Sequence, residues 1–83
     1  MSLQQKMRMA MINSGKNQAQ LARELNTSTM NISNRINRCR NVKLLCETLE
    51  AIDCDLIIRS RNNGNINFTL TVEDIEEDEQ KNS

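Results

Sequence analysis

The twenty residues from Gln18 to Asn37 read QAQLARELNTSTMNISNRIN and predict two short helices joined by a tight turn. Apolar residues recur three and four positions apart in each half, so each helix has one face for a core. Asn26 tolerates the left-handed backbone that ends a helix, and Thr27 and Ser28 offer hydroxyls to cap the next one. Ala19, Ala22 and Leu25 fall on one face of the first helix, with Leu21 beside Ala22, and Ile32 and Ile36 can face the same core from the second.

The second helix of this pair is expected from about Thr29 to Arg38, and its outer face has a particular chemistry. The residues expected to point outward are short, uncharged and mostly able to hydrogen-bond: Thr29, Met30, Ser33 and Asn34. Side chains of this kind suit a helix that reads the edges of base pairs. The alternative interpretation is a polar helix surface that contacts nothing.

Upstream of this stretch the sequence predicts a helix from about Leu3 to Ser14. Ser2 is a suitable N-cap, and Gly15 suits the C-terminal end. Leucine and methionine residues cover one broad face, which indicates a small core. Asn17 and Gln20, three positions apart, predict a capping box for the helix that follows.

Downstream, Asn41 is the expected cap of a fourth helix, from Val42 to about Ile52. Its apolar residues recur at spacings of three and four, which is typical of an amphipathic helix. The four helices together predict one compact domain over residues 1–55.

The hydrophobic period changes from Leu56 onward, where apolar and polar residues alternate in two runs separated by Asn62-Asn63-Gly64-Asn65. Asn-Gly between alternating runs predicts a β-hairpin, because both central residues of a type I′ turn need φ > 0. The hairpin is expected over residues 56–72. Alone it would be marginal in water, so we expect it to pair with the same hairpin of a second subunit across a two-fold axis. The expected contacts are Leu56, Ile58, Ile66, Phe68 and Leu70.

The formal net charge is zero, but the charges are unevenly distributed along the chain. Residues 1–61 contain ten Lys and Arg against five Asp and Glu, an excess of five positive charges. Residues 62–83 contain one Lys against six Asp and Glu, an excess of five negative charges. Residues 73–83, EDIEEDEQKNS, are too acidic and too poor in apolar residues to fold alone, so a disordered acidic tail is expected there.

Several classes of protein find no support in the composition. The sequence has no His, no CxxC pair and no Gly-rich phosphate loop, so neither catalytic residues, a metal site nor a cofactor is expected. Phe68 is the one aromatic residue, which argues against single-strand binding by base stacking. No apolar run approaches the ~20 residues of a membrane span, and no signal peptide is recognisable. A cytoplasmic protein with reduced thiols is the expectation.

The segment from Leu21 to Asn37 resembles the helix-turn-helix regulators of the phage-repressor-like Cro/CI (XRE) family. The resemblance covers Leu3 to about Leu56, and a hairpin stands where the five-helix form of the family has its last helix. Asn26 replaces the usual turn Gly, Thr27 stands at an apolar position, and Arg38 stands where a Gly often ends the recognition helix. The matching residues are Gln18, Leu21-Ala22, Leu25, Asn26, Ser28 and Ile32.

The resemblance implies a four-helix helix-turn-helix domain. With the hairpin, which lies outside the resemblance, the expected fold is mainly α, with a C-terminal β-hairpin that pairs between subunits. The resemblance also implies a role for each matching position. Base edges in the major groove would be read by Thr29, Met30, Ser33 and Asn34, with Asn31 at the margin. The DNA backbone would be contacted by Lys16, Gln18, Arg35, Asn37, Arg38, Arg40 and Lys43.

These expectations lead to two hypotheses about function. The first is a sequence-specific, dimeric transcription regulator, a repressor of its own operon in a phage or mobile element, that binds double-stranded DNA at an inverted repeat. The second is a protein-binding module, such as an antitoxin or an anti-CRISPR-type inhibitor of a host defence, in which the hairpin or the acidic tail contacts the partner. For the tail alone, the simplest role is solubility, and the sharper one is competition with DNA for the basic residues.

Overall fold

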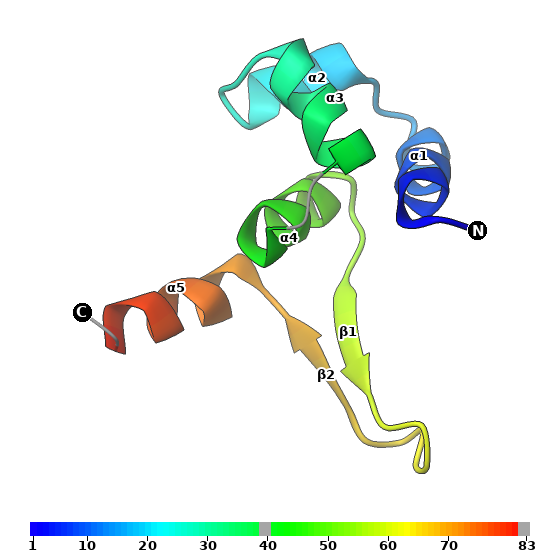
Figure 1. The fold of residues 1–83 in the computed structure, drawn as a ribbon, viewed down its shortest axis with the longest axis vertical. Helices are drawn as coiled ribbons and strands as arrows, with labels where there is room; N and C mark the ends of the chain where they lie inside the picture. Colours follow the sequence, from blue (N-terminus) through cyan, green and yellow to red (C-terminus); the bar gives the residue numbers. More distant parts are fainter. Residues whose placement is uncertain (39–40, 82–83) are drawn as a thin grey trace.

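The computed structural model of the chain describes residues 1–38 and 41–81, with side chains as far as Glu79 (Figure 1). This part of the chain is mainly helical and has one small antiparallel hairpin. The elements are α1 (Leu3–Ser14), α2 (Gln18–Glu24), α3 (Thr29–Arg38), α4 (Val42–Ala51), β1 (Leu56–Arg59), β2 (Asn67–Leu70) and α5 (Val72–Lys81). None of the helices in these ranges is long and apolar enough to cross a membrane.

The ends of the first two helices follow the predicted caps. Ser2 and Gln5 form a reciprocal capping box on α1, and Gly15 ends that helix in the left-handed conformation with φ 78°. Asn17 and Gln20 form the same kind of box on α2. These bonds satisfy backbone N–H groups that a helix start leaves unpaired. The predicted cap of α4 is also confirmed, since the Asn41 side chain accepts from the backbone of Leu44.

The turn between α2 and α3 is a Schellman motif followed by a serine cap. Asn26 has φ 52°, as predicted for the residue that ends α2. The backbone N–H of Thr27 donates to the Ala22 carbonyl at 2.8 Å, which closes the motif. The Ser28 hydroxyl then accepts from the backbone of Asn31 at 3.1 Å. The turn therefore sets where α3 begins and at which angle it leaves α2.

A small core joins the first four helices. Its buried members come from α1, α2, α3 and the end of α4: Met7, Leu21, Ala22, Ile32, Ile36 and Ile52. Burying one of the isoleucine, leucine or methionine side chains in this core contributes about 1.5–3 kcal/mol. Figure 1 shows the hairpin extending away from these helices and α5 running to one side, next to α4.

The predicted hairpin forms, but its second strand ends at Leu70, Val72 belongs to α5, and the turn differs from the predicted one. Leu56 pairs with Leu70 and Ile58 with Phe68, so these four side chains share one face. The predicted type I′ turn at Asn63-Gly64 is wrong, because neither residue has a positive φ. A wider loop connects the strands, held by the Ser60 hydroxyl, which accepts from the backbone of Asn63, and by the Asn63 side chain, which accepts from the backbone of Asn65. These side-chain bonds take the place of the tight turn.

The predicted disorder from Glu73 onward is also wrong for the residues that the structure describes, because α5 is a helix there. Thr71 and Asp74 form a capping box in which each side chain accepts from the backbone N–H of the other residue. Val72 and Ile75 are half-buried, and two glutamates of α5 form ion pairs with Lys43 on α4. The capping box and the contact with α4 stabilise this helix, which its acidic sequence with few apolar residues would not form alone.

Candidate nucleic-acid interface

The outer face of α3 carries the four predicted base-reading residues. Ile32 and Ile36 are buried and fix the opposite face against the core. Thr29 and Asn34 are exposed, and the Met30 side chain is 73% exposed, while Ser33 is half-buried. The face is therefore accessible, uncharged and held by a helix that cannot rotate without exposing two isoleucines.

Asn37, one of the predicted DNA-backbone contacts, is used inside the protein. Its side-chain carbonyl accepts from Gln4 Nε2 at 2.9 Å and from Arg8 Nη2 at 3.0 Å. Its amide donates to the Ser33 hydroxyl at 3.2 Å. Asn37 thus ties α1 to the C-terminal end of α3, and the Ser33 hydroxyl still has its own proton to donate.

Arg35 forms an ion pair between α3 and α4. Its Nη1 lies 2.8 Å from Glu47 Oε1, and the two side chains are 15% and 31% exposed. A charge-assisted bond at this distance, largely shielded from water, holds the guanidinium toward α4. Arg35 therefore positions α3 rather than standing free at its surface.

Both predicted lysine contacts also have partners within the chain. Lys16 Nζ donates to the Ala51 carbonyl at 2.7 Å and to Glu24 at 3.1 Å. Lys43 Nζ lies 3.1 Å from Glu79 and 3.8 Å from Glu76, both on α5. The hydrogen bond to Glu79 raises the pKa of Lys43 above its ordinary value. A DNA phosphate would have to compete with these carboxylates.

The remaining predicted contacts with the DNA backbone differ from one another in their exposure to solvent. Arg38 is exposed at the C-terminal end of α3, and Gln18 is half-buried at the start of α2. Arg40 lies outside the described residues. Arg23 was not predicted as a contact, yet it is exposed on α2, next to α3. Its position in the last turn of α2 was readable from the sequence, but its exposure depends on how α2 packs.

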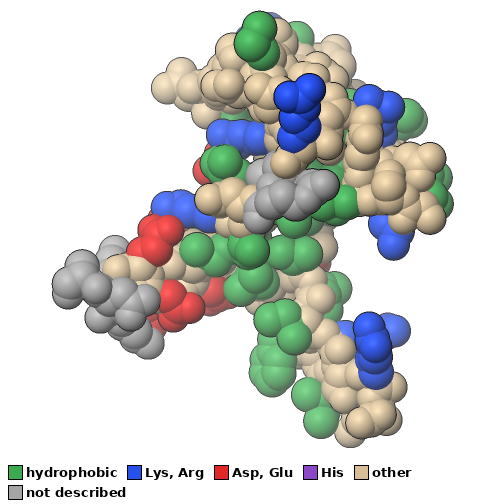
Figure 2. Space-filling view, viewed as in Figure 1, with side chains coloured by type: hydrophobic (Ala, Val, Ile, Leu, Met, Phe, Trp, Pro, Cys, Tyr) green, Lys and Arg blue, Asp and Glu red, His purple; other side chains and the backbone are tan. Residues whose placement is uncertain are grey.

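The five residues expected at a subunit contact divide between the base and the far part of the hairpin. Leu56 and Leu70 are half-buried at the base. Ile58 is 60% exposed and Phe68 is 66% exposed, and Ile66 in the loop is also exposed. Figure 2 shows hydrophobic side chains along the side of the hairpin that faces α5. The hairpin thus carries an apolar face that its own chain leaves mostly open.

Charge is separated in space as well as along the chain. In Figure 2 the acidic side chains gather at α5, whereas Lys and Arg side chains are spread over the helical end and the far part of the hairpin.

Among the described side chains, no three Cys, Asp or Glu residues lie close enough together to hold a metal ion. Cys46 is buried and donates to the Leu70 carbonyl, and burial raises the pKa of its thiol.

Comparison with known proteins adds no relative: no protein family, no curated protein and no solved structure matches this chain.

Proposed function

We propose that this protein is a sequence-specific DNA-binding regulator that inserts α3 into the major groove. The observation that supports this best is the exposed, uncharged outer face of α3, opposite the buried Ile32 and Ile36. The Schellman turn from α2 and the Asn37 and Arg35 bonds hold that face in one orientation. A reading helix needs such preorganisation, because a base contact tolerates little displacement.

On this proposal the exposed residues of α3 divide the work by their chemistry. Asn34 has an amide that can form a bidentate pair with adenine, and Met30 can pack on a thymine methyl group. Thr29 and the Ser33 hydroxyl add single hydrogen bonds. Arg38, with the amide of Gln18, contacts phosphates and sets the register of the helix.

The proposed regulator is a dimer and recognises an inverted repeat. One short helix reads only a few base pairs, so specificity needs two such helices at a fixed distance. Adjacent major grooves on one side of DNA are ~34 Å apart, and the hairpin pairing proposed for two subunits would set that distance. A small dimer of this kind would repress transcription by blocking access of RNA polymerase to the promoter. Its proposed target is its own promoter, in a phage or mobile element.

The experiment is selection of bound sequences from random double-stranded DNA, followed by fluorescence anisotropy on the selected site. We expect an inverted repeat, and an affinity that falls steeply with salt because phosphate contacts release counterions. Asn34→Ala should lose about 1–3 kcal/mol of discrimination at one base pair of each half-site. Asn13→Ala, an exposed asparagine on α1, is the matched control and should change nothing. Unchanged sequence preference in Asn34→Ala would remove that residue from the site.

A second candidate is a protein-binding module, and the open apolar face of the hairpin beside the acidic α5 favours it. An antitoxin or an anti-CRISPR-type inhibitor would use this surface and leave α3 without a ligand. The same selection separates the two candidates. If no DNA sequence is enriched at low salt, the regulator is ruled out and the module remains.

A further inference from the structure

We propose that the hairpin–α5 face of this protein binds the hairpin of a second copy of the chain, with Arg61 of each copy against the acidic side of α5 of the other. The hairpin–α5 face consists of Ile58, Phe68 and Leu70 on the hairpin and Glu73 and Glu77 on α5. It combines an apolar surface with a row of carboxylates. The proposal shares with the function above only the expectation of a dimer.

The apolar part of this face is incomplete in one chain. Ile58 and Phe68 are cross-strand partners on the same side of the hairpin, and each is more than half exposed. Figure 2 shows hydrophobic side chains along the side of the hairpin toward α5. A two-stranded hairpin is at best marginally stable by itself in water, and covering this face with another apolar surface would stabilise it.

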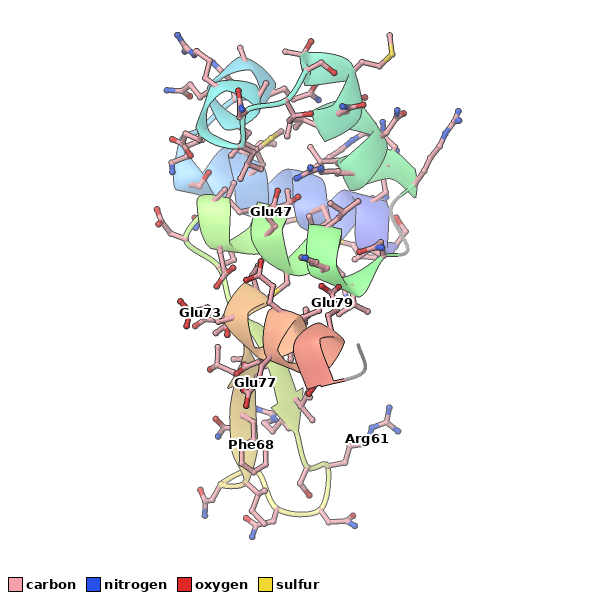
Figure 3. All side chains as sticks on the ribbon, turned by 90° about the vertical axis from the view of Figure 1, so that its left-hand side faces the viewer. Glu47, Arg61, Phe68, Glu73, Glu77 and Glu79 are labelled. Atoms are coloured by element: carbon pink, nitrogen blue, oxygen red, sulfur yellow. The ribbon has the colours of Figure 1, made fainter. Side chains whose placement is uncertain are left out.

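Glu73 and Arg61 carry opposite charges on the same chain but lie apart. Figure 3 shows Glu77 projecting from α5 on the side toward the hairpin, and Arg61 projecting from the far end of the hairpin. Arg61 and Glu73 are both exposed, and among the described residues neither forms an ion pair within the chain. In Figure 3 Arg61 lies at the far end of the hairpin and Glu73 lies on α5, so the two charges are apart.

A two-fold axis resolves both deficits at once. In an isologous dimer every contact is made twice, so a surface must complement itself. If two hairpins lie antiparallel with their apolar faces together, Ile58 and Phe68 meet their counterparts near the axis. The far end of each hairpin then reaches the base of the other, where α5 begins at Val72 and carries Glu73. Arg61 is thereby brought to a cluster of carboxylates of opposite sign.

Charge reversal tests the arrangement without DNA. Sedimentation equilibrium should give twice 9.5 kDa for the native protein. Arg61→Glu should weaken self-association at least about tenfold, because it sets like charges against each other, and so should the double variant Glu73→Arg/Glu77→Arg. Arg23→Glu, an exposed arginine on α2, is the matched control and should leave self-association unchanged.

Mixing the two variants gives the decisive result. Each homodimer has two repulsive contacts, whereas the mixed dimer has two attractive ones, so we expect a heterodimer at concentrations where each variant alone is monomeric. Circular dichroism checks that both variants fold. A native monomer, or a native dimer whose variants associate like the native protein and do not prefer each other, would overturn the proposal.

Salt provides a measurement that needs no variant. Raising NaCl from about 0.05 M to about 0.5 M should weaken self-association of the native protein several-fold, since exposed ion pairs are screened. A dimer held only by pairing of strand edges would not depend on salt in this way, and that result would also overturn the proposal. Because no DNA is present, a failure here removes the dimer but not the proposed contact of α3 with DNA, and a failure to bind DNA would leave this dimer standing.

Discussion

At the scale of single residues, Gly15 carries a backbone conformation that other residues adopt at a cost. Its φ is 78°, and a Cβ added there would meet nothing within 4 Å. Gly15→Ala should therefore lower the free energy of unfolding by about 1 kcal/mol through the backbone alone. Gly64 also has open space but no left-handed φ, so Gly64→Ala should be neutral or slightly stabilising. Urea denaturation of both variants measures the difference, and equal losses would contradict this account.

The Arg35–Glu47 ion pair is the second residue-scale feature with a measurable contribution. Glu47→Gln keeps the size of the side chain but removes the charge that Arg35 Nη1 contacts at 2.8 Å. We expect a loss of about 1–2 kcal/mol in the free energy of unfolding, typical of a hydrogen bond to a charged group. Glu50→Gln, an exposed glutamate on the same helix, should cost almost nothing. A similar loss in both variants would mean that the pair has no special role.

Single residues were predictable where their partners are close in sequence. Ser2, Asn17, Asn26 and Asn41 act as local caps or turn residues, and each partner lies within five positions. Lys16 and Asn37 each have a partner more than thirty positions away, Ala51 for Lys16 and Gln4 for Asn37. Such bonds depend on how helices cross, which residue spacing does not contain. For this reason the sequence indicates which side chains are polar, but not which of them already form hydrogen bonds within the protein.

At the scale of elements, the contact between α4 and α5 should depend on pH at its alkaline end. The pKa of Lys43 is raised above its ordinary 10.5 by the hydrogen bond to Glu79. A raised pKa means that the contribution to stability is complete below the ordinary value and is lost as pH rises through the folded value. Far-ultraviolet circular dichroism should therefore show α5 helicity constant to about pH 10 and falling above it.

A lysine on another surface supplies the control for that titration. Lys43→Gln should remove most of the alkaline transition and lower helicity already at neutral pH, because the two glutamates of α5 lose their partner. Lys6→Gln, exposed on α1, should keep the transition. If Lys43→Gln titrates like the native protein, the ion pairs do not hold α5 in place.

Two elements differ from their sequence predictions for reasons that are physical. The type I′ turn was predicted from Asn63-Gly64, but Ser60 and Asn63 bond to nearby backbone N–H groups and favour a wider loop. The disorder of the acidic segment was predicted from its composition. The capping box from Thr71 to Asp74 was visible in the sequence and would have indicated a helix start. The packing of α5 on α4 through Lys43 could not be predicted from the sequence.

At the scale of the whole molecule, the proposed dimer makes the spacing of the DNA half-sites a testable quantity. Two reading helices in a rigid dimer face the same side of the duplex only if the half-sites are separated by whole turns of ~10 base pairs. Inserting about 5 base pairs at the centre of the selected site should lower affinity at least tenfold, to the level of an isolated half-site. Anisotropy titration measures this. Equal affinity for both spacings would indicate that the subunits read DNA independently.

The outer face of α3 has one further consequence, which concerns evolution. Thr29, Met30 and Asn34 are exposed on this face. Other residues of the same helix hold it against α1, α2 and α4: Ile32, Ile36, Arg35 and Asn37. Substitutions at the three exposed positions should therefore change stability little. Selection can alter the ligand preference of this surface while the scaffold persists, so copies of this fold could diverge in target within few mutational steps and without passing through unfolded intermediates.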